Sequence, residues 1–437
     1  MCKRVPLHLQ SPFLAFVDFH HPPQKYEISH IIFSYLHDNM QTMGGNKMNT
    51  HRWMSMQFFS FFMTWGIFLP YWTGWIIHAK GITVPQASLI MSLGLVARGL
   101  STLVAFPYLS GKFSSKTLLN GAGIGTLIAI LFYIPSGSFT SLLIVTLVFH
   151  FFYPALMPTL DSAAGVLVQS NQLRHYGKSR QWGSIGFILA GMILSVFTGM
   201  LGDKVILWAF LLGAMVLVCL GFMRAPVILS KKPPVDQIQK GGMLKLFHIK
   251  HFSLVLIIVI LLQAAHASYY NYGYLFLQEI HAPKYLIGAI INIAVVAEII
   301  FFSIADRKFH KFSVGSLLAM AALGSTVRWI LVFAFPNVIV FCIAQTLHAC
   351  SFAMGHYAFM KYLIKNISPA QLPKAQGIYS ALALSWSTAV FTIFGGYLYE
   401  IEPRYAFIGM IVCTIPSMLL ALLYRKLEVR KESVISI

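Results

Sequence analysis

Residues 159–190, TLDSAAGVLVQSNQLRHYGKSRQWGSIGFILA, decide the fold, because they contain the end of one apolar span, a short basic loop and the start of the next span. Asp161 is one of very few acidic residues in apolar surroundings, and Arg180 stands at the mouth of the second span. Gly183 and Gly186 follow at a spacing that lets one membrane helix lie close against another. The pattern fits either a pathway for a polar solute or a topogenic loop with an ordinary small-residue packing face.

The whole chain shares this apolar character. Its 437 residues are 57% hydrophobic and 10% charged, with a mean hydropathy of +0.71, whereas soluble domains are about 45–50% apolar and about 25% charged. We therefore predict an integral protein of the lipid bilayer. The five cysteines have no metal-binding spacing. The basic residues behind the net charge of +19 are dispersed among short loops, which argues against a nucleic-acid partner.

Apolar runs recur from Trp53 onward, and about 20 residues are enough to cross the hydrocarbon core. We predict an all-α membrane fold with twelve spans, at 54–78, 85–109, 117–134, 139–167, 181–200, 205–223, 251–277, 284–304, 313–334, 337–362, 375–399 and 405–424. A polar stretch divides them six and six, and QLRHYGKSRQWGS in the first half is echoed by QLPKAQGIYSAL in the second. This predicts two six-helix bundles with a pseudo-two-fold axis along the membrane normal.

The predicted domains follow from these spans. We assign residues 48–223 to the first bundle, 224–250 to a linker, 251–425 to the second bundle and 426–437 to a tail. In residues 1–47, prolines and histidines interrupt every apolar run. We interpret this extension as disordered, or as lying upstream of a functional start at Met48. A short peripheral helix near residues 31–37 is the alternative.

Lysine and arginine concentrate in the loops of one side. The opposite side carries only Lys80, Lys204, Lys284 and Arg404. The positive-inside rule then places both termini and the linker in the cytoplasm. We expect a monomeric multi-pass protein of the cell inner membrane.

Buried charges are the first candidates for function. Only Asp161 and Glu298 lie well inside spans among the acidic residues after Met48. An ionised carboxylate in the membrane is costly unless it faces a partner or a cavity, so we predict that both take part in proton coupling. Arginine keeps its charge and needs a partner. Arg98 either forms a structural charge pair with Asp161 or lies on the transport path, and Arg328 is the cation of span nine.

Aromatic side chains are dense in spans one and seven. Trp65 and Trp72 lie on one helical stripe, and Tyr269 and Tyr270 follow in span seven. Such rings can stack on an aromatic solute, so we predict that they bind substrate. Packing or an interfacial belt is the alternative.

Three further polar residues lie within spans. We expect His266 and Asn271 to line the substrate path and His348 to take part in proton coupling. A membrane histidine is also a common interhelical hydrogen-bonding residue, and that interpretation stays open.

SIADRKFHKF, residues 303–312, resembles the loop signature of the major facilitator superfamily, and PYLSGKFSSK, residues 107–116, is a copy without the Asp. Three further motifs are similar to the branch that holds lactose permease, nucleoside:proton symporters and 3-phenylpropionate permeases. They are YGKSRQWGSIGF at 176–187, STVRWI at 325–330 and TLH at 346–348. The resemblance implies secondary active transport by alternating access.

The resemblance also implies roles for single residues. Arg180 matches an arginine that helps to bind substrate in lactose permease, and Arg328 matches a coupling arginine. The proton-carrying glutamate expected one turn after His348 is Ser351 here, so coupling through that position is not carried over.

Phenylpropionate permeases are similar in FFMTWGIFLPYWTGWI, QAAHASYYNYGYLFL and VVAEIIFF, of spans one, seven and eight. This implies uptake of a small aromatic carboxylate such as 3-phenylpropionate together with a proton. We expect Arg180 or Arg328 to bind the carboxylate and Glu298 to carry the proton, with no cofactor. A nucleoside or an oligosaccharide is the alternative substrate. The chain has no P-loop, HExxH or GxSxG motif, and a membrane enzyme or sensor is the alternative from another class.

Overall fold

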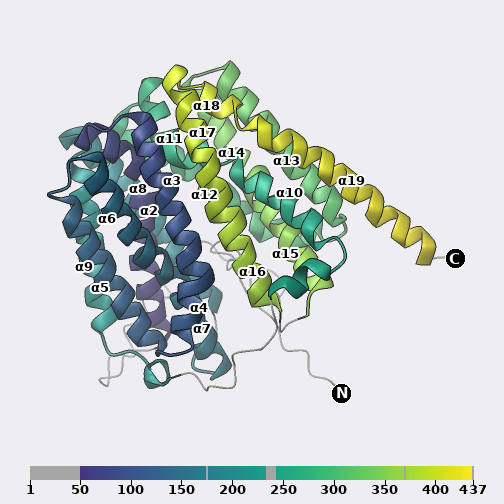
Figure 1. The fold of residues 1–437 in the computed structure, drawn as a ribbon, viewed down its shortest axis with the longest axis horizontal. Helices are drawn as coiled ribbons and strands as arrows, with labels where there is room; N and C mark the ends of the chain where they lie inside the picture. Colours follow the sequence, from purple (N-terminus) through teal and green to yellow (C-terminus); the bar gives the residue numbers. More distant parts are fainter. Residues whose placement is uncertain (1–49, 174–175, 233–242, 369–370, 436–437) are drawn as a thin grey trace, which may run out of the picture.

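The described chain is helical throughout. A computed structural model describes residues 50–173, 176–232, 243–368 and 371–435, and no β-strand occurs in these ranges. The N half comprises α2 (Thr50–Lys80), α3 (Val84–Leu100), η1 (Ser101–Ala105), α4 (Phe106–Ser110), α5 (Ser115–Tyr133), α6 (Phe139–Phe152), η2 (Tyr153–Ala155), α7 (Leu156–Gln169), α8 (Tyr176–Leu201) and α9 (Val205–Phe222), followed by η3 (Val227–Ser230) (Figure 1). The expectations for residues 1–47 and for the start at Met48 lie outside the described residues.

The C half begins with the short η5 (Met243–His248). It continues with α10 (Phe252–Ala264), α11 (Ala267–Glu279), η6 (Lys284–Leu286), α12 (Ile287–Phe309), α13 (Val314–Ala334), α14 (Val338–Thr346), η7 (Ala349–Met354), α15 (Gly355–Asn366), α16 (Leu372–Ala381), η8 (Leu382–Trp386), α17 (Ser387–Ile401), α18 (Tyr405–Ile408) and α19 (Ile411–Ile435). The two halves stand side by side as separate bundles (Figure 1).

Twelve helical stretches follow the twelve predicted spans. In the described residues, 11 stretches are long and apolar enough to cross a membrane. The remaining one, α2, has 31 residues, and its tryptophans, tyrosines and polar residues lower its hydropathy. This helix packs against α8, α9 and α11, with Trp53 and Trp72 buried. Neighbouring helices rather than lipid therefore surround much of α2, and the fold of two six-helix bundles is confirmed.

Local sequence signals set the helix ends. Thr83 accepts a hydrogen bond from the Gln86 backbone N–H, and Gln86 Oε1 accepts one from the Thr83 N–H, which forms a capping box at the start of α3. Gly81 and Gly202 follow α2 and α8 with φ of 67° and 75°. Glycine takes this left-handed conformation without a steric penalty, so each helix can end there.

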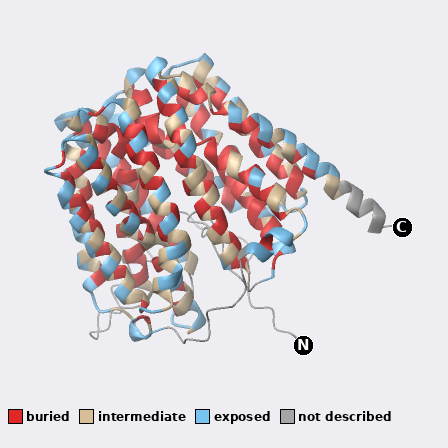
Figure 2. Ribbon diagram, in the orientation of Figure 1, coloured by how far each residue is buried: buried red, intermediate tan, exposed pale blue. Residues whose placement is uncertain are grey.

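Burial follows the bundle architecture. Buried residues occupy the helix faces that meet inside each half, and exposed residues lie along the outside (Figure 2). Many exposed side chains are large and apolar, including Ile193, Leu212 and Val390. An apolar exterior is expected where lipid is the surrounding solvent.

The halves meet mainly at the end where α2, α8, α11 and α17 finish, which we call the linker-distal end. Ser88 Oγ lies 2.6 Å from Tyr272 Oη, and Thr73 Oγ1 donates to Asn271 Oδ1 at 3.1 Å. Between described residues, each hydrogen bond that joins the halves lies between the span midpoints and this end. The larger apolar core cluster also contains residues of both halves, so the structure is closed at the linker-distal end.

Asp203, in the loop between α8 and α9, forms part of this closure. Tyr274 of the C half donates a hydrogen bond to Asp203 Oδ1 at 2.7 Å, and His78 Nδ1 pairs with Oδ2. Burial raises the pKa of the Asp203 carboxyl, but the hydrogen bonds of His78 and Tyr274 outweigh burial and hold that pKa below its ordinary value. The closed arrangement therefore stabilises an ionised Asp203.

We predict that Tyr274→Phe weakens this closure. The change removes the hydroxyl that reaches Asp203 but keeps the ring, which lies 4.7 Å from the Tyr71 ring between centroids. A hydrogen bond to a charged group contributes about 1.5–3 kcal/mol, so the ratio of closed to open molecules should fall on the order of tenfold or more. Pulsed electron paramagnetic resonance between spin labels at Gln86 and Ile401, with the native cysteines replaced by serine, measures that ratio.

Tyr397→Phe is the matched control, because Tyr397 is an exposed tyrosine of α17 at the same end. It should leave the distance distribution unchanged. Equal distributions for Tyr274→Phe and Tyr397→Phe would show that the bond to Asp203 does not hold the halves together.

Candidate functional site

A cavity lies between the two halves, near the middle of the spans. Its water-accessible volume is about 60 Å³ in this closed state, below the roughly 300–1,000 Å³ typical of small-molecule sites. α2 and α8 form one wall, and α11, α12 and His348 form the other. The lining residues are Trp65, Leu69, Pro70, Phe187, Tyr269, Tyr270, Gly273, Tyr274, Ile291, Ala294, Val295, Glu298 and His348.

Aromatic rings make up much of the wall. Trp65 packs against the Tyr153 ring at a centroid distance of 5.8 Å, and Tyr269 and Tyr270 lie 5.5 Å apart. Trp65, Tyr269 and Tyr270 therefore line one cavity, and their binding of substrate stays a prediction. Trp72 does not line this cavity. It stacks on Trp75 with a centroid distance of 4.5 Å inside the N half, because at this level of α2 the aromatic stripe faces the core of its own bundle.

Glu298 on α12 is the carboxylate of the cavity. Its Oε1 lies 2.7 Å from His348 Nε2, and its Oε2 is buried without a hydrogen-bond partner. His348 Nδ1 in turn lies 2.6 Å from Arg328 Nη1. Because a guanidinium can only donate, His348 Nδ1 accepts. A neutral His348 then carries its proton on Nε2 and donates it to Glu298.

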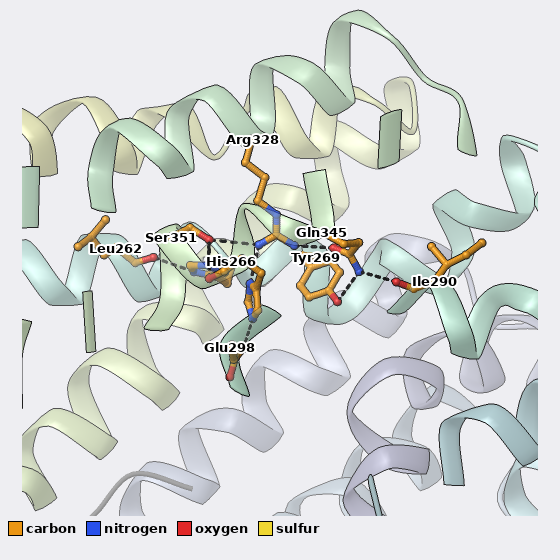
Figure 3. A network of polar contacts seen from close by, with 9 residues as sticks. Leu262, His266, Tyr269, Ile290, Glu298, Arg328, Gln345 and Ser351 are labelled. Atoms are coloured by element: carbon orange, nitrogen blue, oxygen red, sulfur yellow. Dashed lines mark hydrogen bonds and ion pairs between the residues drawn. The ribbon is translucent and has the colours of Figure 1, made fainter. Parts of the chain in front are cut away.

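The network continues from Arg328 toward the cavity wall. Arg328 Nη2 donates to Gln345 Oε1 at 2.7 Å, and Gln345 Nε2 donates to Tyr269 Oη at 2.8 Å (Figure 3). The guanidinium also lies 4.6 Å from the Tyr269 ring centroid and 4.4 Å from that of Trp329. Arg328 is buried and does not line the cavity. Its position suits a residue that acts through His348 and Gln345 rather than by direct contact with a solute.

The other two polar candidates of span seven, His266 and Asn271, form hydrogen bonds within the C half, and Asn271 also takes part in the closure. His266 Nδ1 lies 2.9 Å from the Leu262 carbonyl, and its Nε2 lies 3.0 Å from Ser351 Oγ (Figure 3). This histidine is therefore connected to the network through Ser351. Asn271 donates to Thr392 Oγ1 at 3.0 Å. Neither side chain lines the cavity.

Arg180 and Asp161 form a separate group in the N half. Tyr176 donates a hydrogen bond to Asp161 Oδ1 at 3.0 Å. No ion pair joins the described Arg180 and Asp161, and the three guanidinium nitrogens of Arg180 are buried without a hydrogen-bond partner. The Arg180 guanidinium lies 3.8 Å from the Phe62 ring centroid. Neither charged residue lines the cavity.

The structure does not bring Arg98 and Asp161 together as a charge pair. Arg98 lies over Trp65 instead, with its Cζ 5.2 Å from the ring centroid. Among described residues, no ion pair joins Arg98 to a carboxylate.

Gln345 and Phe187 are among the contributors to the site that sequence reasoning missed. Gln345 links Arg328 to the cavity wall, and it precedes His348 by three residues, a spacing that puts both on one helical face. Phe187 lines the cavity and lies at the end of the quoted motif at 176–187. Each had a signal in the sequence, although neither is charged.

Comparisons with known proteins agree with this architecture. The chain is 29% identical over 373 residues to a probable 3-phenylpropionic acid transporter of Escherichia coli (strain K12), which covers 85% of this chain and 97% of that protein. It is 27% identical over 305 residues to a maltose permease of Geobacillus stearothermophilus, covering 68% and 74% respectively. These relatives are transporters, not enzymes.

The crystal structure of the nucleoside transporter NupG has a TM-score of 0.73 with this chain. The sequences are 16% identical, and the match covers 87% of this chain and 99% of that one; it shows a shared fold. The model of the MFS_1 like family matches residues 51–409. This chain therefore belongs to the MFS_1 like family of the major facilitator superfamily and is a transporter.

Proposed function

We propose that the protein takes up a small aromatic carboxylate, such as 3-phenylpropionate, together with a proton. The observation that carries the proposal is the cavity between the halves, where aromatic rings surround Glu298 with one free carboxyl oxygen. A flat ring can stack on Trp65, Tyr269 or Tyr270. The relative named as a probable 3-phenylpropionic acid transporter supports the same class of substrate.

Glu298 is the proposed proton carrier. Burial away from water favours the neutral form of a carboxyl group, and contact with water favours the ionised form. Glu298 Oε2 is free to hold a proton, while His348 and Arg328 fix Oε1. A change in which side of the membrane the cavity faces would therefore load and release the proton. Asp161, in its separate group with Arg180, is assigned a supporting role in the N half.

The direction of transport follows from the charge of the loops. The positive-inside rule places the linker and both termini in the cytoplasm, so the linker-distal end would face outward from the inner membrane. Rocking of residues 48–223 against 251–425 would then open the cavity alternately to the two sides. The protein would act as a monomer.

An oligosaccharide is the second candidate substrate. The observation in its favour is the similarity to a maltose permease, and aromatic walls also stack on sugar rings. A sugar has no charge and needs hydrogen-bonding partners, whereas a carboxylate needs a cation, so the two substrate classes differ in the polar contacts that they require.

We predict that Glu298→Gln abolishes uphill uptake but leaves exchange of substrate across the membrane. Glutamine keeps an oxygen that can accept from His348 Nε2 but cannot carry a proton at that position. Accumulation of labelled 3-phenylpropionate in proteoliposomes with an inward proton gradient should fall to simple equilibration. Glu402→Gln is the control, because Glu402 pairs with Arg404 outside the cavity. Wild-type accumulation by Glu298→Gln would remove Glu298 from the coupling mechanism.

We also predict that aromatic acids stabilise the purified protein against heat. A ligand that binds only the folded state adds about 2.7 kcal/mol to the free energy of unfolding at 100 times its Kd. A thermal-shift comparison of 3-phenylpropionate, nucleosides and maltose should give the largest rise in Tm with the aromatic acid. Stabilisation by maltose or by nucleosides alone would replace the proposed substrate class.

A further inference from the structure

Arg98 of α3 lies beside the cavity from the N half. Its Cζ lies 5.2 Å from the ring centroid of Trp65, which lines the cavity, although Arg98 itself does not. Trp386 of the C half donates a hydrogen bond to the Val96 carbonyl at 3.3 Å, so α3 meets the C half next to Arg98. Arg98 thus lies where the two halves meet.

The charges inside the spans do not balance. Arg98 and Arg328 lie well inside the described spans and Arg180 lies near the start of α8, whereas the spans contain two inner carboxylates, Asp161 and Glu298. Arg328 reaches Glu298 through His348. Arg180 is in the same half as Asp161, but no ion pair joins the two described residues, and its three buried guanidinium nitrogens have no hydrogen-bond partner. The third arginine, Arg98, has no ion pair with a described residue, and its buried Nε has no hydrogen-bond partner.

An arginine in this position needs an anion from outside the chain. The guanidinium does not deprotonate in proteins, and an uncompensated charge in the membrane is costly. The face of the Trp65 ring compensates the charge only in part. The other two arginines are less well placed for a solute: the nitrogens of Arg328 bind Gln345 and His348, and Arg180 lies against Phe62, which, unlike Trp65, does not line the cavity.

We propose that Arg98 is the anion subsite of the cavity and binds the carboxylate of the transported solute. The ring of the solute then occupies the space between Trp65 and Tyr270. This assignment rests on the proposed function, and it moves the carboxylate contact from Arg180 or Arg328 to α3. It also makes a monoanion, rather than a neutral aromatic molecule, the preferred ligand.

The test compares an acid with its neutral isostere. Binding of 3-phenylpropionate and of 3-phenylpropanamide to the purified full chain is measured by calorimetry for the wild type, Arg98→Gln and Arg98→Lys. The wild type should bind the acid on the order of 10 to 100 times more tightly than the amide, as expected for a charged hydrogen bond. Arg98→Gln should bind the two equally, with the amide affinity unchanged, and Arg98→Lys should keep part of the preference because it keeps the charge.

Arg404→Gln is the matched control, since it removes one arginine charge outside the cavity and should keep the wild-type preference. An unchanged preference for the acid in Arg98→Gln would overturn the assignment of Arg98 while leaving the proposed function intact. A wild type that binds neutral solutes but no aromatic acid would overturn both. If Arg98→Gln does not fold, the Arg98→Lys variant provides the test. Lysine lacks the paired donors of arginine, so an acid preference equal to that of the wild type in Arg98→Lys would overturn a direct contact between Arg98 and the carboxylate.

Discussion

The hydrogen bond between Arg328 and His348 determines the chemistry of the cavity. Arg328 can only donate, so it forces His348 to accept at Nδ1 and to carry a proton at Nε2. That proton points at Glu298 Oε1 and leaves Oε2 as the unbonded oxygen. Arg328, which stays charged, therefore sets the tautomer of His348. It also determines that Oε2 of Glu298 is the carboxyl oxygen without a hydrogen bond. The membrane makes this constraint strict, because water is not at hand to offer other partners.

The helices bend away from regular geometry where these polar residues lie. A π-helical segment begins directly after His348, another follows shortly after Arg98, and a third ends at Trp386. The break between α10 and α11 comes at His266. Such segments leave backbone groups outside the regular pattern and often occur at functional sites. Because these segments lie near the middle of the spans, each half can bend at them while the packing at the helix ends is kept.

The sequence was sufficient for the fold and for part of the site. Span positions depend on apolar length alone, so all twelve were predictable, and α2 differs only in being rich in aromatic residues. Glu298 and His348 were predictable because charge and histidine are rare inside spans. The prediction that Trp72 lines the cavity was wrong, because helical spacing alone does not show which residues of a stripe face the other half and which face the core of their own bundle. The partner of Arg98 was missed because a charge pair depends on which faces of α3 and α7 meet, and spacing along the chain does not give this.

The contacts that close the linker-distal end include several of one kind. Ser195 donates to the Tyr285 carbonyl at 3.0 Å, Asn292 to the Ile188 carbonyl at 3.1 Å and Ser92 to the Ala389 carbonyl at 2.7 Å. In each case a small side chain binds a backbone oxygen of the other half. Incoming water can replace both partners when the halves separate, so little hydrogen-bond energy is lost on opening. Hydration of these carbonyls would accompany separation, and the open and closed forms can then stay close in free energy while each remains well defined.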